Sequence, residues 1–319
     1  MKRVLSLLAA GTLLLALTLL SGCGNKDTGA SSVSGNTAAT TAATAAATAG
    51  INADGNYQNG SYVVLGAALS NEQYGVGFRK ADQALRDEVQ KQLCAMKADG
   101  KLATITTKWF GKDSSTVPDT FTPGDDADGS LDKVKTVGVF KLGLDDSFPP
   151  MGYQDADGNI VGYDIDLATE VCARMGVTLK LVPIDWNSKE LELNNGNIDC
   201  IWNGFTITDE RSAAFNMTEP YLDNRQVVVT TKDSGITDMA GLAGKSVVYQ
   251  SGSTAQDAIE ATENAAIKNS IKSLSEVDNN VNAMFELQQG ISDAVIMDEV
   301  VAMYYINHLT EMQAAANGG

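Results

Sequence analysis

The sequence predicts an α/β fold with mostly parallel sheets, and the order of its elements is the main reason. From residue 74 onward, short runs of β-branched and apolar residues alternate with segments whose apolar residues recur at helical spacing. The chain has 319 residues, of which 44% are apolar and 6% aromatic. This composition is rich enough for a buried core, and the length favours two domains or two lobes.

The N-terminus has the pattern of an exported protein. Lys2 and Arg3 precede an apolar run over residues 4–20, which is typical of a signal peptide and short for a membrane span. The run ends in Leu-Ser-Gly-Cys at residues 20–23, which resembles the bacterial lipoprotein signal, whose cysteine receives a diacylglyceryl group and begins the mature chain. An ordinary signal peptide with a chance cysteine is the alternative. We expect a lipoprotein signal peptide over residues 1–22 and lipidation of Cys23.

A low-complexity segment follows at residues 23–56. It is dominated by Ala, Thr, Gly, Ser and Asn without an apolar period, so it cannot bury enough surface to offset the entropy of ordering. Interleaved threonines also weaken a helix over the Ala-rich residues 38–49. We expect a flexible tether here.

The first folded elements are a strand and two helices. Tyr74, Val76 and Phe78 alternate as in a strand, and residues 82–97 form a helix whose apolar stripe is Leu85, Val89, Leu93 and Met96. A second, short helix ends at residue 110. Residues 111–130 are polar, with two prolines and many aspartates, and are predicted to be a loop or linker.

The same patterns assign the rest of the chain. Strands are predicted at residues 134–140, 177–182, 198–202, 226–231, 246–249 and 294–297. Helices are predicted at residues 165–175, 188–195, 254–264, 279–289 and 298–306.

The charge balance and the residue types exclude several classes of function. Acidic residues outnumber basic ones by 40 to 23, a formal charge of -17, which argues against a nucleic-acid-binding protein. His308 is the single histidine, which disfavours zinc enzymes and chemistry based on histidine. We expect neither a metal nor a cofactor.

The cysteines form no CxxC pair, so they indicate neither a metal knuckle nor a disulfide scaffold. We expect Cys94, Cys172 and Cys200 to be structural thiols. A bridge between Cys172 and Cys200 stays open at this stage.

Polar residues follow several predicted strands, at the edge where open α/β sheets bind ligands. After the strand that ends at residue 202, Gly204 allows close approach, Thr206 offers an N–H and a hydroxyl, and Arg211 offers a planar set of donors that suits a carboxylate. The alternative is a solvated arginine on a surface helix.

Three further strand ends carry candidate groups. Ser253 and Thr254 open a helix whose free N–H groups could hold an anion, although a simple N-cap is the alternative. Asp298 could hold an ammonium group, or could cap the next helix. The loop at 143–151 carries acidic and aromatic residues, or is only a connecting turn.

Together these groups describe a receptor for a zwitterion, and residues 134–306 resemble a known family that fits this description. The resemblance is to the extracytoplasmic substrate-binding lipoproteins of polar-amino-acid ABC importers, family 3 of the solute-binding proteins. It rests on residues 145–151, 161–168, 198–211, 215–221, 244–254 and 293–299. The family implies a type II periplasmic-binding-protein-like fold, in which two α/β lobes joined by two hinge strands close on one amino acid.

The resemblance also implies roles for individual residues. Arg211, Thr206 and the Gly204 N–H would bind the ligand carboxylate, and Ser253 and Thr254 would complete that site. Asp298 would bind the amino group. Phe148 and Trp186 would flank the ligand side chain, with Asp145 near its tip. From the residues themselves, Asp145, Asp146 and Glu190 would suit a cationic side chain stacked on the aromatic rings.

The chain departs from the family in the order of its segments. Residues 61–111 look like the C-terminal end of the family but precede its first strand, which indicates a circular permutation. The expected domains are a strand at 57–66 completing lobe 2, lobe 1 at 67–226 with a linker at 112–132, and lobe 2 at 227–319. A separate small domain at 57–110 is the alternative, but it would have a poor core.

We therefore expect a monomeric receptor on the extracytoplasmic face of the cell membrane, held by its lipid anchor, that delivers a polar and conceivably cationic amino acid to an ABC importer. One alternative is an enzyme on the same fold, similar to cyclohexadienyl dehydratase, with Glu190, Asp145 and Asp146 as candidate acids and bases. The other is a sensor domain that signals through a separate partner.

Overall fold

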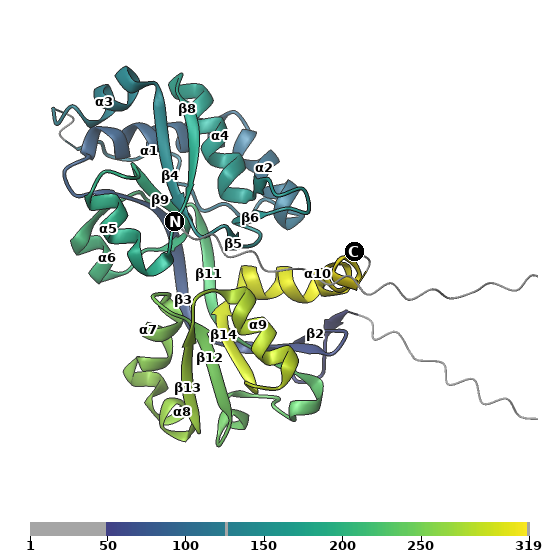
Figure 1. The fold of residues 1–319 in the computed structure, drawn as a ribbon. Helices are drawn as coiled ribbons and strands as arrows, with labels where there is room; N and C mark the ends of the chain where they lie inside the picture. The colour runs from purple at the N-terminus through teal and green to yellow at the C-terminus, as the bar shows by residue number, and fades with distance from the viewer. Residues whose placement is uncertain (1–48, 125–126, 318–319) are drawn as a thin grey trace, which may run out of the picture. The chain divides into compact units, whose positions relative to one another are not determined.

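The computed structural model describes residues 49–124 and 127–317, with side chains as far as His308. One compact unit extends over residues 46–319 (Figure 1). The predicted signal peptide, Cys23 and most of the predicted tether lie outside the described residues. The end of the tether was predicted wrongly, because Gly50–Ile51 form a strand and Asn56 is buried, with its Nδ2 donating to the Thr237 carbonyl at 2.7 Å.

A mixed sheet organises this unit. In the described residues it contains eleven strands, and eight of them form one continuous order, β13-β12-β14-β11-β3-β9-β4-β8. Their bounds are β13 Ser273–Val277, β12 Ser246–Gln250, β14 Ala294–Asp298, β11 Leu222–Thr231, β3 Tyr62–Arg79, β9 Cys200–Thr206, β4 Val139–Leu144 and β8 Thr178–Pro183. The short strands β1 Gly50–Ile51, β2 Tyr57–Asn59 and β10 Phe215–Met217 pair beside them, and β5 Ser147–Phe148, β6 Gly152–Gln154 and β7 Ile160–Val161 form a small separate sheet.

The two ends of the sheet are the centres of two lobes. In lobe 1, β4 pairs in parallel with β8 and β9, and in lobe 2, β12 pairs in parallel with β13 and β14. Lobe 1 carries α1 Gln83–Ala98, α2 Lys101–Phe110, α3 Ser130–Val137, α4 Tyr163–Met175, α5 Lys189–Asn194 and α6 Asp209–Ala214. Lobe 2 carries α7 Thr254–Glu260, α8 Ala265–Ser270, α9 Asn280–Gln289 and α10 Glu299–Asn317 (Figure 1). The predicted α/β fold with two lobes is confirmed. The expectation of mostly parallel sheets is wrong, because β3 and β11 pair antiparallel with each other and with β9 and β14 of the two lobes.

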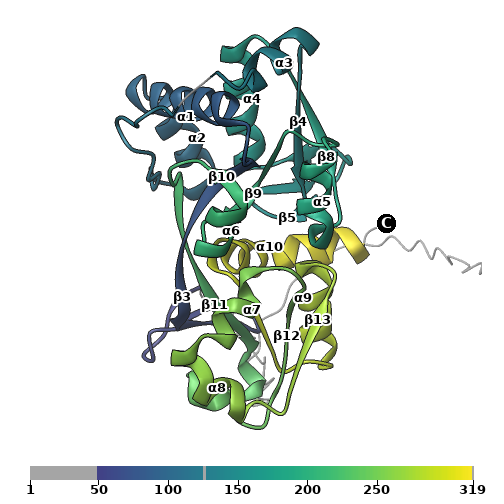
Figure 2. The same cartoon turned by 90° about the vertical axis from the view of Figure 1, so that its left-hand side faces the viewer.

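β3 and β11 connect the lobes. They run antiparallel and side by side from one lobe to the other (Figure 2). At one end of β3, Val63 is paired with Thr230 of lobe 2, and at the other end Tyr74 is paired with Thr206 of lobe 1. Residues 62–79 therefore belong to the sheet of both lobes, and they form one strand where the sequence predicted two short ones.

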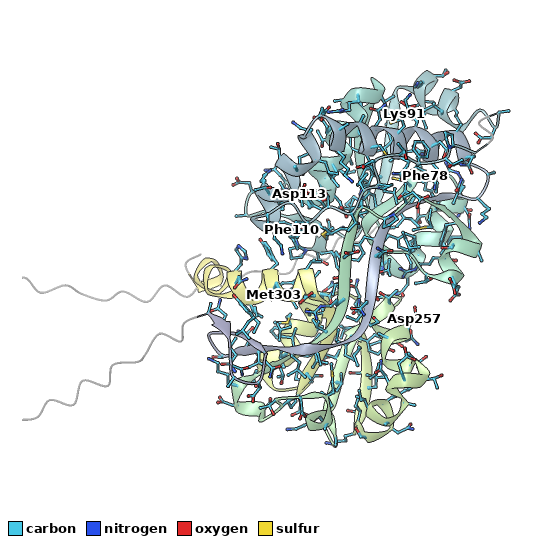
Figure 3. All side chains as sticks on the ribbon, turned by 180° about the vertical axis from the view of Figure 1, so that it is seen from behind. Phe78, Lys91, Phe110, Asp113, Asp257 and Met303 are labelled. Atoms are coloured by element: carbon cyan, nitrogen blue, oxygen red, sulfur yellow. The ribbon has the colours of Figure 1, made fainter. Side chains whose placement is uncertain are left out.

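The buried apolar side chains form one large cluster that includes residues of both lobes and smaller clusters within one lobe. The predicted stripe of α1 is fully buried, at Leu85, Val89, Leu93 and Met96. Phe78 of β3 points into the same core, whereas Lys91 on the outer side of α1 is exposed (Figure 3). In lobe 2 the core gathers side chains of β3, β11, β12, β14 and α7. The stripe that the sequence predicts is thus the face by which α1 holds β3 in place.

Cys94, Cys172 and Cys200 are free thiols. Burial raises the pKa of Cys172 to about 12 and that of Cys200 well above its usual range. Both thiols therefore stay protonated and unreactive at neutral pH. This agrees with structural thiols, and the bridge between Cys172 and Cys200 that the sequence left open is not formed.

Some predicted elements are wrong. Residues 130–137 form the helix α3, and the strand predicted at 134–140 begins only at Val139, because Gly138 at φ +73° ends the helix between them. The helix predicted at 254–264 stops at Glu260. The sequence interpretation also missed β13 and α8. In the described part of the chain, no helix has the length and apolar character that crossing a membrane requires.

Candidate functional site

A pocket lies where the two lobes face each other, at the carboxyl ends of their strands. Eleven described residues line it: Asp145, Phe148, Trp186, Asn203, Gly204, Thr206, Arg211, Gln250, Ser253, Thr254 and Asp298. Four of the strands that deliver them, β4, β9, β12 and β14, end at or next to a lining residue. The structure thus brings together every residue that was predicted for the ligand, although their roles remain a proposal. The predicted lipidation site, Cys23, lies outside the described residues.

The pocket is nearly closed. About 290 Å³ of space between the lining residues is free of protein atoms, but the centre of a water-sized sphere can occupy only about 10 Å³ of it. That is room for roughly one water molecule. A molecule of amino-acid size can enter only if the lobes or the lining side chains move apart.

Arg211 supplies the positive charge of the pocket. Its Nη1 donates to the Thr206 carbonyl at 3.0 Å, and its guanidinium carbon lies 4.4 Å from the centre of the Phe205 ring. Burial lowers the pKa of Arg211, and among the described residues no carboxylate forms an ion pair with it. A desolvated cation without a partner favours binding of an anionic group.

Gly204 allows close packing but does not offer its N–H to a ligand. Its φ is +56°, and a Cβ atom there would lie 2.9 Å from Phe148 Cε1. The N–H donates to Asp164 Oδ2 at 2.7 Å, a carboxyl group whose pKa burial raises to about 7. The expected use of this N–H for the ligand carboxylate is therefore wrong for this conformation, because a buried side chain already occupies it.

Ser253 acts as a helix cap. Its hydroxyl donates to the Gln250 carbonyl at 2.7 Å and accepts from the Ala255 N–H at 3.3 Å, and its own N–H also bonds to the Gln250 carbonyl. Of the two interpretations of Ser253, the helix cap therefore agrees with the structure, since its hydroxyl and its N–H are both bonded within the protein. Its neighbour Thr254 keeps its hydroxyl on the pocket, 3.3 Å from the Thr206 hydroxyl of the other lobe.

Asp298 ends β14 and is buried. Its Oδ1 accepts hydrogen bonds from the Tyr74 hydroxyl at 2.6 Å and from Asn224 Nδ2 at 2.7 Å. Burial, followed by the negative charge of Glu72, raises the pKa of Asp298 to about 7. No described lysine or arginine forms an ion pair with it, so this carboxylate lacks a counter-charge.

Asp145 is a second buried carboxylate without an ion pair among the described residues. Its Oδ1 accepts from the Ser147 N–H and hydroxyl, and its Oδ2 accepts from Gln250 Nε2 at 2.8 Å, across the gap between the lobes. Phe148 and Trp186 are buried walls of the same pocket. The other acids that were considered lie elsewhere: Asp146 bonds to Gln154, and Glu190 is exposed on α5.

The sequence interpretation missed some residues of the site. Asn203 and Gln250 also line the pocket. Gln250 ends β12, and Asn203 lies inside β9 but directly follows the strand predicted at 198–202, so the rule that located the others could have found them. The hinge residues Glu72, Asn224 and Gln226 bond to lining side chains. The positions of these hinge side chains depend on the register of β3 against β11. No local pattern in the sequence could predict that register.

The family model of the bacterial extracellular solute-binding proteins, family 3, matches residues 24–112 and 140–296, more than half of the chain. The chain belongs to this family. The match consists of two segments, separated by most of the residues between α2 and β4.

Individual relatives agree with this assignment. The chain is 26% identical over 178 residues to the L-cystine-binding protein TcyJ of Escherichia coli, which is 55% of this chain and 65% of that protein. It is 32% identical over 160 residues to the ABC transporter arginine-binding protein 1 of the same species, 50% of this chain and 63% of that protein. The chain therefore spans a little under two thirds of the length of these curated relatives.

A solved structure of an ABC uptake transporter substrate-binding protein from Streptococcus pneumoniae with bound histidine is also similar. It shares 36% sequence identity with this chain at a TM-score of 0.56, and the match covers 58% of this chain and 76% of that one. The fold of this family member agrees with the two-lobed architecture described above.

Proposed function

We propose that this protein binds a polar amino acid outside the cell and, as a monomer, delivers it to the membrane subunits of an ABC importer. One observation carries the proposal: a single pocket between the lobes holds a guanidinium and carboxylates that have no ion-pair partners among the described residues. A free amino acid brings the matching pair of charges. Membership of the solute-binding family and the printed names of the relatives support the same conclusion.

We assign the ligand carboxylate to Arg211 and to the hydroxyls of Thr206 and Thr254. The ammonium group is assigned to Asp298. Gly204 serves by leaving room beside Phe148, and Ser253 serves by capping the helix that carries Thr254.

The ligand side chain is proposed to be cationic. Asp145 is a buried carboxylate on the pocket, and a buried charge is costly unless a counter-charge pairs with it. Phe148 and Trp186 would stack on a guanidinium or ammonium group. The arginine-binding relative is consistent with this choice.

A thermal-shift assay with the twenty standard amino acids tests the proposal. A ligand that binds only the folded protein stabilises it by RT ln(1 + [L]/Kd), about 2.7 kcal/mol at a hundredfold excess over Kd. We expect the largest increases in melting temperature with arginine, with lysine and with ornithine, which is added to the panel. Mass spectrometry of the recovered ligand should find it unchanged. Conversion to a product would instead favour the alternative that the protein is an enzyme on the same fold. No shift with any amino acid would contradict the proposal.

We also propose that the chain is a circular permutation of its family. β3, α1 and α2 precede β4 in the chain, yet β3 lies in the middle of the sheet, between β11 and β9. The family match is split in two, and the relatives align with only 50–55% of the chain, as expected when one continuous alignment cannot follow both segments. The proposed domains are those predicted: 57–66 and 227–319 for lobe 2, and 67–226 for lobe 1 with its linker at 112–132.

The proposed location is the extracytoplasmic face of the cell membrane, with Cys23 as the lipid anchor. Changing Cys23→Ser should abolish labelling by a clickable fatty acid and release the protein from membranes. Cys94→Ser is the matched control and should keep the label. Label retained in the Cys23 variant would show that the anchor lies elsewhere.

A further inference from the structure

Glu72 lies on the hinge strand β3, on the face that carries the polar residues behind the pocket. The strand register pairs Glu72 with Asn224 and pairs Gln226 with both Ser70 and Asp298. Residues directly opposite each other in neighbouring strands share a face, and so do residues two apart along one strand. Glu72 and Tyr74 therefore lie on the same side of the sheet as Asp298, although more than two hundred residues separate them along the chain.

The Glu72 carboxylate accepts hydrogen bonds from lobe 1 and from the second hinge strand. Its Oε2 accepts from Thr206 Oγ1 at 3.2 Å, from Asn224 Nδ2 at 3.0 Å and from Gln226 Nε2 at 3.1 Å. The side chain is half-buried, and none of the described ion pairs includes it. Burial lowers the pKa of Arg211, and the strongest influence that opposes this effect is the charge of Glu72.

These bonds use the hydroxyl protons that a ligand would need. Each threonine hydroxyl has one proton to donate. The Thr206 hydroxyl donates to Glu72, so the 3.3 Å contact between Thr206 and Thr254 requires the Thr254 hydroxyl to be its donor. Gln226 Nε2 donates in turn to Thr254 Oγ1 at 3.3 Å. The Thr206 proton is therefore used by Glu72 and the Thr254 proton by Thr206, so neither hydroxyl proton is free for the ligand carboxylate.

We propose that Glu72 is an internal competitor of the ligand: its carboxylate accepts the hydrogen bond from the Thr206 hydroxyl that the carboxylate of a bound amino acid would take over. This inference rests on the proposed function of the pocket. The chain of bonds also joins the lobes, because Thr206 belongs to lobe 1 and Thr254 to lobe 2. Glu72 thus stands at one end of the hydrogen bonds that link the lobes, and a ligand carboxylate must displace it from Thr206.

The consequence is unusual for a charged residue beside a binding site, because its removal should improve binding. Glu72→Gln removes the charge and leaves a weaker acceptor for Thr206. It also removes the negative charge that disfavours a second carboxylate beside Asp298. Both changes favour the bound state, so we expect affinity to rise about fivefold or more. A residue that bound the ligand ammonium directly would give the opposite result.

Isothermal titration calorimetry at about pH 8, with the twenty standard amino acids as probes, tests the inference on the full mature protein. Glu263→Gln is the matched control, since it removes the same charge from an exposed position of lobe 2 and should leave affinity unchanged. Glu72→Asp is a second variant, in which the shorter side chain keeps the charge but withdraws the acceptor from Thr206. It should gain part of the affinity, and it keeps the test decisive if the glutamine variant does not fold.

The outcomes separate this inference from the proposed function. Tighter binding by Glu72→Gln, with no change in Glu263→Gln, supports it. Binding by the wild-type protein with equal or weaker affinity in the Glu72 variants overturns the inference and leaves the proposed function standing. No binding of any amino acid by the wild-type protein overturns both.

Discussion

At the scale of single residues, Arg211 is the group whose loss should matter most for binding. It has no ion pair among the described residues, so Arg211→Ala should leave the fold intact. Loss of a desolvated charged hydrogen bond costs on the order of 3 kcal/mol, or more than a hundredfold in affinity. Calorimetry with the best ligand of the panel measures the effect. Arg174→Ala, which removes an arginine paired with Glu170 and Asp99 on lobe 1, is the control and should bind normally.

Asp298 should make binding depend on pH near neutrality. Its pKa is raised to about 7 by burial and by the charge of Glu72, so the carboxyl is protonated below that value and ionised above it. An ammonium group requires the ionised form. Besides Glu72, the groups that act on Asp298 are Tyr74 of β3, Asn224 and Gln226 of β11, and the guanidinium of Arg211, and none of these changes charge in this range.

Affinity should therefore fall as the pH drops through about 7, approaching a tenfold loss for each further pH unit. Titration calorimetry between about pH 5 and pH 8 records the profile, since a free amino acid keeps both of its charges over this range. Asp298→Asn should bind on the order of a hundredfold more weakly at pH 8, and its profile should be flat. A flat profile in the wild-type protein would contradict the assignment of Asp298.

The sequence could predict which residues meet in the pocket but not which of their groups are free. Arg211, Thr206, Thr254 and Asp298 each follow a strand, and strand ends of one sheet converge. The outcomes at Gly204 and Ser253 have different causes. The Gly204 N–H is used by Asp164, forty residues earlier in the chain, and no local pattern shows that contact. Ser253 bonds to its neighbours Gln250 and Ala255 as a helix cap, which was the alternative that its position in the sequence allowed.

At the scale of secondary-structure elements, α5 should help to hold the two lobes together in the closed form. Lys189 of α5 is buried and donates to the Gly252 carbonyl of lobe 2 at 3.1 Å and to the Trp186 carbonyl at 3.2 Å. Burial, and then the nearby charge of Arg211, lower the pKa of Lys189 to about 8. Its charge is held by these two backbone carbonyls and by the Trp186 ring, whose centre lies 5.2 Å from Nζ, and the Gly252 carbonyl moves away when the lobes open.

Lys189→Met should therefore destabilise the closed form more than the fold itself. The loss of one hydrogen bond from a charged donor is about 1.5 kcal/mol, close to a tenfold loss of affinity. Stopped-flow kinetics should show this loss as faster dissociation, because the contact exists only after closure. Lys180→Met on the exposed side of β8 is the control. An unchanged rate of ligand dissociation in the Lys189 variant would contradict this role of Lys189.

Periodicity predicted the long elements well and the short ones poorly. α1 has four fully buried residues at helical spacing, so its pattern is unambiguous. Residues 134–140 contain three valines that suit a strand, but the first belongs to α3, whose other valine, Val137, is exposed. The missed strand β13 lies at the edge of the sheet and is largely exposed, so it lacks the apolar signal of a central strand.

At the scale of the whole molecule, the order of segments along the chain differs from their order in space. β3 lies between β11 and β9, although it precedes both by more than a hundred residues. Composition and periodicity could not show this arrangement, because they describe segments one at a time. The resemblance of residues 61–111 to the end of the family was the only signal in the sequence, and it predicted that this region serves both lobes.

The same placement predicts what happens when residues 57–111 are removed. The deletion takes β3 out of the middle of the sheet, so β11 and β9 each lose one of their two neighbouring strands. It also removes α1, and the apolar faces against which Leu85, Val89 and Met96 pack become exposed. The loss of a central strand and two helices exceeds the stability of a typical domain, which is about 5–15 kcal/mol.

The fragment 132–319 should therefore be insoluble or molten, with secondary structure in the far-ultraviolet circular dichroism but no fixed aromatic signal in the near ultraviolet. Placing residues 57–111 after residue 306 should restore both the fold and ligand binding, because that order keeps every contact and changes only which loops close. The two chains differ only by this segment, so their comparison isolates its role. If the fragment alone unfolds cooperatively on heating and binds an amino acid, then residues 57–111 do not complete the lobes, and the proposed permutation is wrong.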